Sequence, residues 1–308
     1  MTHLSVLFTY IIICVKILKV IQNKGAVKMK KLALVVDSTA VIEKDIFEKY
    51  QNLYKVPLMI LHQGKSYIDG EDITSDELFT KFDLAKDLPT TSQPAVGEVL
   101  DLFENLLKDY EKVIYITISS KISGTYQTGV LAKNQVDVSR ITVFDTEITS
   151  VVQREMALRV LRMNEEGRDF DYILSSLEEM KKNSTIYLCV DNLRHLGRTG
   201  RVSNVSAVVG SMLKIKPILM FQNGSINLHS KIRTLPKAHL ELVKLLKDCD
   251  LPDSSRIMIA HAKGLPYAEK LKSEINLLYP KQEVYIGELS PVISVHTGPN
   301  TVGIAWIR

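Results

Sequence analysis

The sequence predicts an α/β protein of two domains. Strand-like runs of buried, β-branched residues alternate with amphipathic helices over residues 31–182, which is typical of a parallel sheet covered by helices. From about residue 184 the pattern changes to a hairpin signal and strands of mixed direction. We therefore expect a parallel-sheet α/β/α domain at residues 29–183 and an α/β domain with a mixed sheet at residues 184–308.

In the first domain, residues 31–36 form a continuous apolar run, which indicates a strand buried on both faces. A second strand is expected at residues 54–61, where Pro57 indicates an edge or a strand start. The apolar residues at 96–110 recur on one helical face, and Thr74 begins a capping motif. The other expected strands and helices are strands 113–118 and 140–144, and helices 43–50, 155–165, 170–182 and one from residue 125.

The second domain is expected to begin with a strand and a basic, glycine-containing segment. A Gln-Asn-Gly turn at residues 222–224 predicts a hairpin between two apolar runs. The expected strands are 185–190, 215–221, 225–229, 257–262, 284–289 and 302–307, and the expected helices are 202–213, 235–247 and 267–278. Mixed strand directions follow, because a hairpin is antiparallel whereas a helical crossover joins parallel strands.

The composition excludes several classes of function. The 308 residues are 45% hydrophobic and 24% charged, with a net charge of +4, and no dense basic block with interleaved aromatic residues suggests nucleic acid. The three cysteines are far apart in the sequence and lack metal-ligand spacing, which favours a reducing, cytoplasmic compartment and argues against a metal site or disulfides. They are Cys14, Cys189 and Cys249.

Residues 4–21 are strongly apolar, as in a signal peptide or a membrane anchor. Lys16 and Lys19 interrupt the run, and no positive charge precedes it. The codons available for residues 24–28 allow a bacterial ribosome-binding sequence just before Met29. We therefore expect residues 1–28 to be a leader translated from a start assigned too early, which sequencing the N-terminus of the natural protein would test.

Four polar loops follow strands or precede helices in the first domain. They lie at residues 37–39, 90–92, 119–124 and 145–146. Hydroxyl groups that converge at one sheet edge can bind an oxygen-rich ligand, and the N–H groups of a helix start favour an anion. The alternative is that each loop is a cap or a turn, with Ser123 serving only the start of its helix.

A lone histidine, His296, lies in a small-residue segment near the C-terminus, where a turn is expected. It is either a binding residue or a structural one. The sequence has no nucleophile elbow, zinc-protease motif, P-loop or dinucleotide fingerprint, which favours binding over hydrolysis. Basic residues gather in the second domain, either as a solvated face or as a docking surface for an acidic partner or a phosphate. They are Arg194, Arg198, Arg201, Lys214, Lys216, Lys231 and Arg233.

Short motifs from about Met29 to Arg308 together resemble the DegV family, the fatty-acid-binding B subunits of bacterial fatty acid kinase. The motifs are VVDST (35–39), VPL (56–58), PTTSQP (89–94), SSKISGTYQ (119–127), FDT (144–146), LGRTGRVS (196–203), KIKPIL (214–219), KIRT (231–234) and HTGPNTVGI (296–304). The resemblance implies two α/β domains with an acyl tunnel between them. It also implies that the chain has no catalysis or cofactor of its own. A separate kinase subunit would bring ATP and convert the bound carboxylate to an acyl phosphate.

The resemblance also implies roles for individual residues. The hydroxyl of Thr91 (with Ser92 beside it), the hydroxyl of Ser123 and the imidazole of His296 would bind the carboxylate, and Gly124 would supply a backbone N–H. Two arginines would dock the kinase, namely Arg201 and Arg233.

One departure from the family concerns residues 149–153, TSVVQ, where many members have two glycines. The larger valine side chains are expected to reshape or narrow the tunnel. Two alternatives stay open: an acyl transferase or hydrolase with Ser123 as nucleophile and His296 as base, and a membrane-anchored lipid sensor if residues 1–28 belong to the natural protein.

Overall fold

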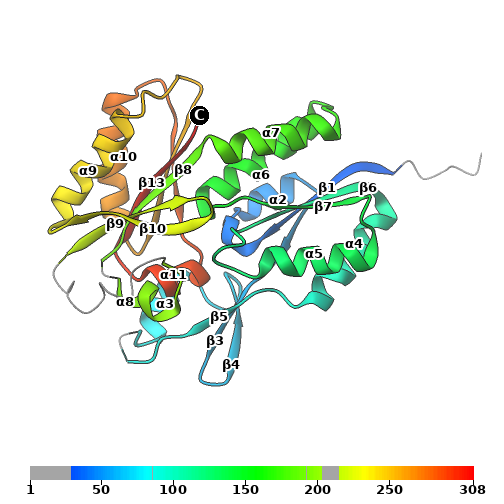
Figure 1. The fold of residues 1–308 in the computed structure, drawn as a ribbon, viewed down its shortest axis with the longest axis horizontal. Coiled ribbons are helices and arrows are strands. Elements are labelled where there is room, and N and C mark those ends of the chain that lie inside the picture. Colours follow the sequence, from blue (N-terminus) through cyan, green and yellow to red (C-terminus); the bar gives the residue numbers. More distant parts are fainter. Residues whose placement is uncertain (1–28, 85, 192, 203–214) are drawn as a thin grey trace, which may run out of the picture.

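The computed structural model describes residues 29–84, 86–191, 193–202 and 215–308 (Figure 1). Expectations for residues 1–28 and for most of the expected helix at 202–213 concern residues outside these ranges.

A parallel four-stranded sheet forms the first half, in the order β2-β1-β6-β7. Alternate residues of β1 face opposite sides. Leu34 packs with α6 (Ser150–Glu165) and α7 (Phe170–Lys182), whereas Val35 packs with the helices α4 and α5. The other bounds are β1 Lys30–Asp37, β2 Leu53–Val56, β6 Tyr110–Thr117, β7 Ile141–Asp145, η1 Ser38–Ala40, α2 Lys44–Lys49, α4 Val96–Asp109 and α5 Thr125–Val136. The expected parallel sheet with helices on both faces is confirmed.

A mixed six-stranded sheet forms the second half, in the order β10-β9-β8-β13-β11-β12. Its neighbours are antiparallel except β11 and β12. The hairpin joins β9 and β10 through Asn223 and Gly224, which both have positive φ, as its turn requires. The bounds are β8 Ser184–Cys189, β9 Lys216–Gln222, β10 Ser225–Ile232, β11 Arg256–Ala262, β12 Val284–Glu288, β13 Thr301–Ile307, α9 Leu235–Lys247 and α10 Leu265–Leu278. Helices α9 and α10 cover one face of this sheet (Figure 1).

A three-stranded sheet, in the order β4-β3-β5, lies beside the two large sheets. Two expectations for the strands of this sheet and one for the segment around His296 are wrong. The single strand expected at 54–61 is two strands in different sheets, because Pro57 lacks the N–H needed to continue the ladder. The expected loop at 90–92 is the short strand β5, and the expected turn around His296 is a helix, α11. The bounds are β3 Met59–His62, β4 Lys65–Ile68, β5 Thr90–Ser92, α3 Ser75–Lys81, α8 Arg194–Thr199 and α11 Pro291–Thr297.

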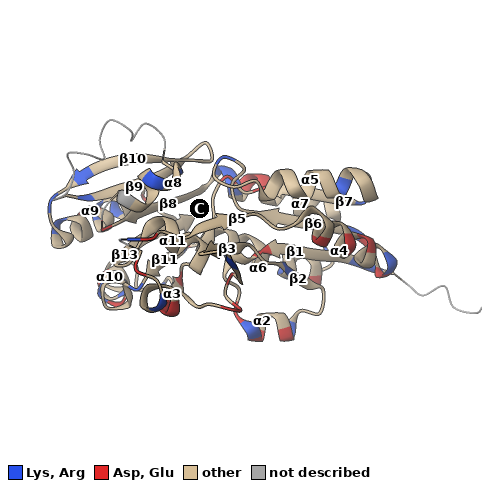
Figure 2. Ribbon diagram, turned by 90° about the horizontal axis from the view of Figure 1, so that it is seen from below, with Lys and Arg blue, Asp and Glu red and all other residues tan. Residues whose placement is uncertain are grey.

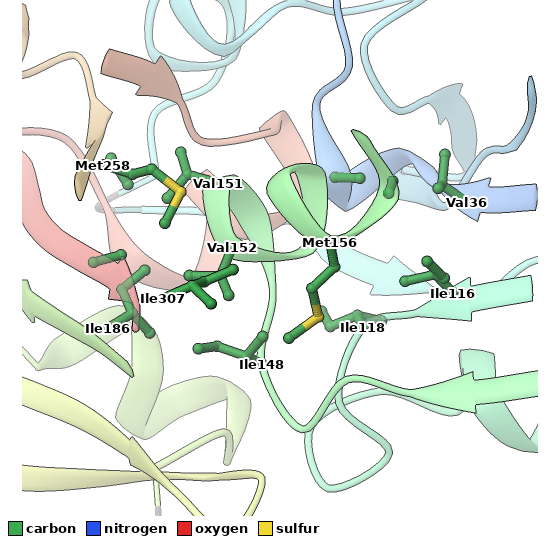
Figure 3. Close-up of a cluster of buried hydrophobic side chains, with 14 of the residues drawn as sticks. Val36, Ile116, Ile118, Ile148, Val151, Val152, Met156, Ile186, Met258 and Ile307 are labelled. Carbon is green, nitrogen blue, oxygen red and sulfur yellow. The ribbon is translucent and has the colours of Figure 1, made fainter. Parts of the chain in front are cut away.

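Helix α6 joins the two halves through one continuous core. Its first turns lie between the large sheets, with Val151 and Val152 on the side of β8, β11 and β13 and Met156 toward β6 (Figure 3). All three side chains are at most 2% exposed. The helix begins at Ser150, earlier than the expected residue 155, so these valines belong to a helix and not to a loop.

Candidate functional site

Two elements far apart in the sequence bring Thr91 and His296 together. Thr91 is the middle residue of β5, where it pairs with Ile60 of β3. His296 lies in the last turn of α11. The Thr91 hydroxyl and the His296 Nε2 atom are 2.8 Å apart across 205 positions of sequence. The fold therefore makes a hydroxyl–imidazole pair that neither segment has alone.

Two oxygen acceptors fix the start of α11. The Ser290 hydroxyl accepts the Ile293 N–H, and the Asp69 carboxylate accepts the Val292 N–H at 2.9 Å. Asp69 is itself fully buried, and this burial raises its pKa to about 6. Because α11 has only seven residues, these caps determine the direction in which its last turn presents His296.

The turn before α5 contributes Ser123 and Gly124. The Ser123 hydroxyl accepts the Thr125 N–H at 3.3 Å and lies 2.8 Å from the Thr125 hydroxyl, so it does serve the start of the helix. A Cβ on Gly124 would lie 1.9 Å from Oε1 of Gln93. Glycine therefore leaves room for the Gln93 amide, which donates to the Thr128 hydroxyl at 3.0 Å.

The imidazole of His296 is held in its neutral form. Burial, helped by the charges of nearby Arg201 and His195, lowers the pKa of His296 to about 3. Its Nδ1 atom has no hydrogen-bond partner within the described part of the chain. The Arg201 guanidinium donates to the Thr199 carbonyl, which holds this positive charge beside the site.

These groups lie in the wall of one cavity, whose polar members are Thr91, Ser92, Gln93, Ser123, Thr149, Arg201, His296 and Thr297. The rest of the wall is apolar and comes from both halves: Leu58, Ile118, Ile122, Leu188, Leu196, Phe221, Ile226, Val292 and Ile293. Its free volume of about 50 Å³ would hold only one or two water molecules, so the walls must move apart to admit a larger ligand. Polar groups beside a mostly apolar wall suit an amphiphile.

A larger open groove of about 710 Å³ lies elsewhere on the surface, along α6. Its walls carry ion pairs such as Arg159 with Glu155 and Arg256 with Glu283. None of the predicted site residues lines it. We therefore assign the site to the smaller cavity, whose wall contains Thr91, Ser123 and His296.

The predicted residues differ in where the structure places them. Thr91, Ser92, Ser123 and His296 line the cavity together, and Gly124 lies in the adjoining turn. Arg201 also lines the cavity, whereas Arg233 is exposed after the end of β10. Figure 2 shows basic segments, in blue, on α8 and β10, the elements that precede Arg201 and Arg233 in the chain.

Three polar cavity residues were missed from the sequence, namely Gln93, Thr149 and Thr297. Thr297 directly follows His296 in the quoted motif, so its position could have indicated it. Gln93 stands directly after Ser92 in the quoted motif, so its position in the loop could have indicated it. Thr149 has no comparable signal, because only the packing of the start of α6 against the cavity reveals it.

Two of the four polar loops do not reach the cavity. The Asp37 carboxylate accepts the Ile118 N–H at 2.6 Å and the Thr39 hydroxyl, and Asp145 accepts the Ser120 N–H at 3.1 Å. By accepting these backbone N–H groups, the two carboxylates hold the turn after β6 in place. Of the two interpretations left open for the four loops, convergence on a ligand does not describe residues 37–39 and 145–146, which line no part of this cavity and support the loop that does.

Two structural features are absent from the described ranges. No group of three or more His, Cys, Asp or Glu side chains in these ranges could hold a metal ion. Among the helices of the described residues, none has the length and apolar character needed to cross a membrane.

The fold and cavity define a class of protein: an α/β protein with two large sheets and a mostly apolar cavity whose walls come from both halves of the chain. A family model described as "Uncharacterised protein, DegV family" matches residues 31–308. The chain therefore belongs to the DegV family.

Relatives with known structures share this fold. Protein DegV of Bacillus subtilis is 37% identical over 277 residues, covering 89% of this chain and 98% of that protein. Its crystal structure, described as a fatty acid binding protein, matches with a TM-score of 0.81 and covers 90% of this chain and 99% of that one. A fatty-acid-binding DegV family protein from Thermus thermophilus matches with a TM-score of 0.84 at 29% identity, covering 90% and 99% of the two chains. A stearic-acid-binding protein from Eubacterium ventriosum matches with a TM-score of 0.80 at 27% identity, covering 90% and 98%.

Proposed function

We propose that this protein binds a long-chain fatty acid between its two domains, residues 29–183 and 184–308, and presents the carboxylate to a separate ATP-dependent kinase. The kinase would form the acyl phosphate, and the chain itself would act in the cytoplasm as a carrier. The fatty-acid-binding relatives support the choice of ligand. The observation that carries the proposal is the Thr91–His296 pair in an otherwise mainly apolar cavity.

The chemistry of the cavity fits both parts of a fatty acid. About a dozen buried methylenes would contribute on the order of 10 kcal/mol. The carboxylate needs hydrogen-bond donors, because an unpaired buried charge is costly. We assign this role to the hydroxyls of Thr91, Ser92 and Ser123, the His296 imidazole and the N–H of Gly124. Arg201 supplies a positive charge beside them.

We assign the kinase contact to the basic surface around the cavity. Arg233 is exposed, whereas Arg201 is only partly exposed and lines the cavity, so the two arginines allow binding and docking to be separated. We expect Arg233→Ala to lower turnover by the kinase while acyl binding is kept. Equal losses of turnover and acyl binding in this variant would contradict a role of Arg233 in docking the kinase.

An acyl transferase or hydrolase is less well supported. The Ser123 hydroxyl bonds Thr125, and the His296 Nε2 atom lies beside Thr91. A histidine with a pKa of about 3 is also a weak base for activating a serine. Sustained hydrolysis of an activated acyl ester that disappears in Ser123→Ala would overturn the carrier proposal in favour of this enzyme.

The direct test is to express the chain in bacteria, denature the purified protein and identify the extracted lipid by mass spectrometry. We expect a long-chain fatty acid in stoichiometric amount. His296→Ala should keep the fold but retain several-fold less acid, because one carboxylate partner is lost. His239→Ala is the matched control, since His239 is also buried but lies on α9 and pairs with Glu274. An empty wild-type protein that also fails to bind added fatty acid would contradict the proposal.

A further inference from the structure

One polar residue of the cavity wall has a hydroxyl without a partner in the described part of the chain. Thr149 lines the cavity and is 2% exposed, yet its hydroxyl has no hydrogen-bond partner among the residues that the structure describes. A buried hydroxyl without a partner costs stability and is uncommon, so its position in a ligand cavity calls for an explanation.

Thr149 is also the N-cap residue of α6, a helix of 16 residues, but its side chain makes no capping hydrogen bond. The next residue, Ser150, is fully buried, and its hydroxyl likewise has no partner in the described ranges. The N–H groups of a first helical turn have no partner inside the helix and carry a partial positive charge. Two hydroxyls and a helix start are thus left unsatisfied together.

An unsubstituted alkyl chain would leave these groups unsatisfied, because methylenes neither donate nor accept hydrogen bonds. An oxygen atom would satisfy them. It can accept a hydrogen bond from the first turn of α6 and from the Thr149 hydroxyl, which can also accept from a ligand hydroxyl. The carboxylate does not meet this need when it lies at Thr91 and His296, since those residues engage it there.

We propose that the cavity selects fatty acids that carry an oxygen substituent, a hydroxyl or keto group, at the point where the acyl chain passes Thr149 and the start of α6. This rests on the proposed function, since it assumes that the cavity binds a fatty acid through its carboxylate. The proposal narrows the ligand from long-chain fatty acids in general to those that carry an oxygen substituent on the acyl chain. Thr149 would be the specificity-determining residue.

The test compares stearate with hydroxystearates whose hydroxyl lies near the carboxylate, in mid-chain or at the methyl end. We expect one of the latter two to bind the delipidated protein about fivefold more tightly than stearate, as one added hydrogen bond provides. Thr149→Val keeps the side-chain shape but removes the hydroxyl. This variant should lose the preference for the hydroxystearate over stearate.

Thr117→Val serves as the matched control. Thr117 is equally buried, but its hydroxyl is paired with the Phe144 carbonyl at 3.2 Å. Without ligand, Thr149→Val should raise the melting temperature and Thr117→Val should lower it. The inference is overturned if stearate binds at least as tightly as every hydroxystearate, or if Thr149→Val leaves the preference unchanged. Failure of stearate itself to bind would instead overturn the proposed function.

Discussion

At the scale of single residues, the proposed site contains a histidine that the fold keeps uncharged. A neutral imidazole donates one hydrogen bond and accepts another, so His296 can bond Thr91 and a ligand at once. The positive charge beside the site comes from Arg201. We infer that carboxylate binding depends little on the protonation of His296 near neutral pH.

Stability should respond to that histidine in a defined direction. The pKa of His296 is lowered to about 3 in the folded protein, against an ordinary value of 6.5. As pH falls below about 6.5 the unfolded chain takes up a proton that the folded chain rejects, so the free energy of unfolding decreases by up to roughly a kilocalorie per mole per pH unit. Asp69, whose pKa is raised to about 6, acts in the opposite direction.

Urea unfolding of wild type and His296→Gln between about pH 7 and about pH 4 measures this effect. The contribution of Asp69 is common to both proteins and cancels in their difference. The wild type should lose stability relative to the variant as pH falls. Parallel curves for the two proteins would contradict the assignment of a buried, neutral His296.

Short motifs in the sequence name residues that the structure brings together, whereas residues placed by packing alone carry no such signal. Thr91 and His296 came from short motifs and lie 2.8 Å apart. Thr149 could not be predicted, because nothing in TSVVQ states that the start of α6 packs against the cavity without a side-chain cap. The two valines of this stretch are buried between the sheets, as Figure 3 shows, so they fill space there.

At the scale of elements, the β9–β10 hairpin forms part of the cavity wall. Phe221 and Ile226 line the cavity from the two strands. The Ser119 hydroxyl donates to the carbonyl of Gly224 in the turn at 2.7 Å, and a Cβ on Gly224 would lie 2.9 Å from that hydroxyl. This contact fastens the hairpin to the loop that carries Ser123.

Ser119→Ala should therefore speed the release of bound fatty acid. Loss of one buried hydrogen bond corresponds to about a fivefold faster dissociation rate if the hairpin lifts during release. Stopped-flow displacement of a fluorescent fatty acid measures this rate. Ser273→Ala is the control, because its hydroxyl bonds the Glu269 carbonyl within its own helix, α10. An unchanged rate in Ser119→Ala would show that ligand leaves by another route.

Most elements were predictable because their hydrophobic periods are regular. Helix α7 has the expected bounds, and the hairpin follows from the Gln-Asn-Gly turn. The errors fall where tertiary pairing overrides local pattern. Residues 90–92 become a strand only because β3 lies beside them, and α11 is stabilised by Asp69 from the first half of the chain.

At the scale of the whole molecule, a charged network also joins the two halves. Arg154 of α6 binds both carboxylate oxygens of Glu43, at 2.8 and 2.9 Å. The Tyr285 hydroxyl of β12 donates to Glu43 at 2.8 Å, and the guanidinium lies 4.0 Å from the centre of the Tyr285 ring. We infer that this network helps to hold the second sheet against α6.

Tyr285→Phe tests that inference, because it removes the hydroxyl while the ring stays under Arg154. The free energy of unfolding should fall by about 1 kcal/mol. Hydrogen exchange should also quicken along the contact of β12 with α6. Tyr172→Phe, at an exposed position on α7, is the control and should change neither quantity. Equal exchange in both variants would show that the halves are held by the apolar core alone.

The strand order of the second sheet bears on how the protein folds during synthesis. Strand β13 lies in the middle of that sheet, between β8 and β11, and β8 precedes it by more than a hundred residues. A nascent chain can complete the four-stranded sheet early. Strands β8 and β11, however, can pair with β13 only after residues 301–307 have been synthesised. Until then the apolar face of α6 lacks its cover, so we expect this interval to be the period in which chaperones bind the chain.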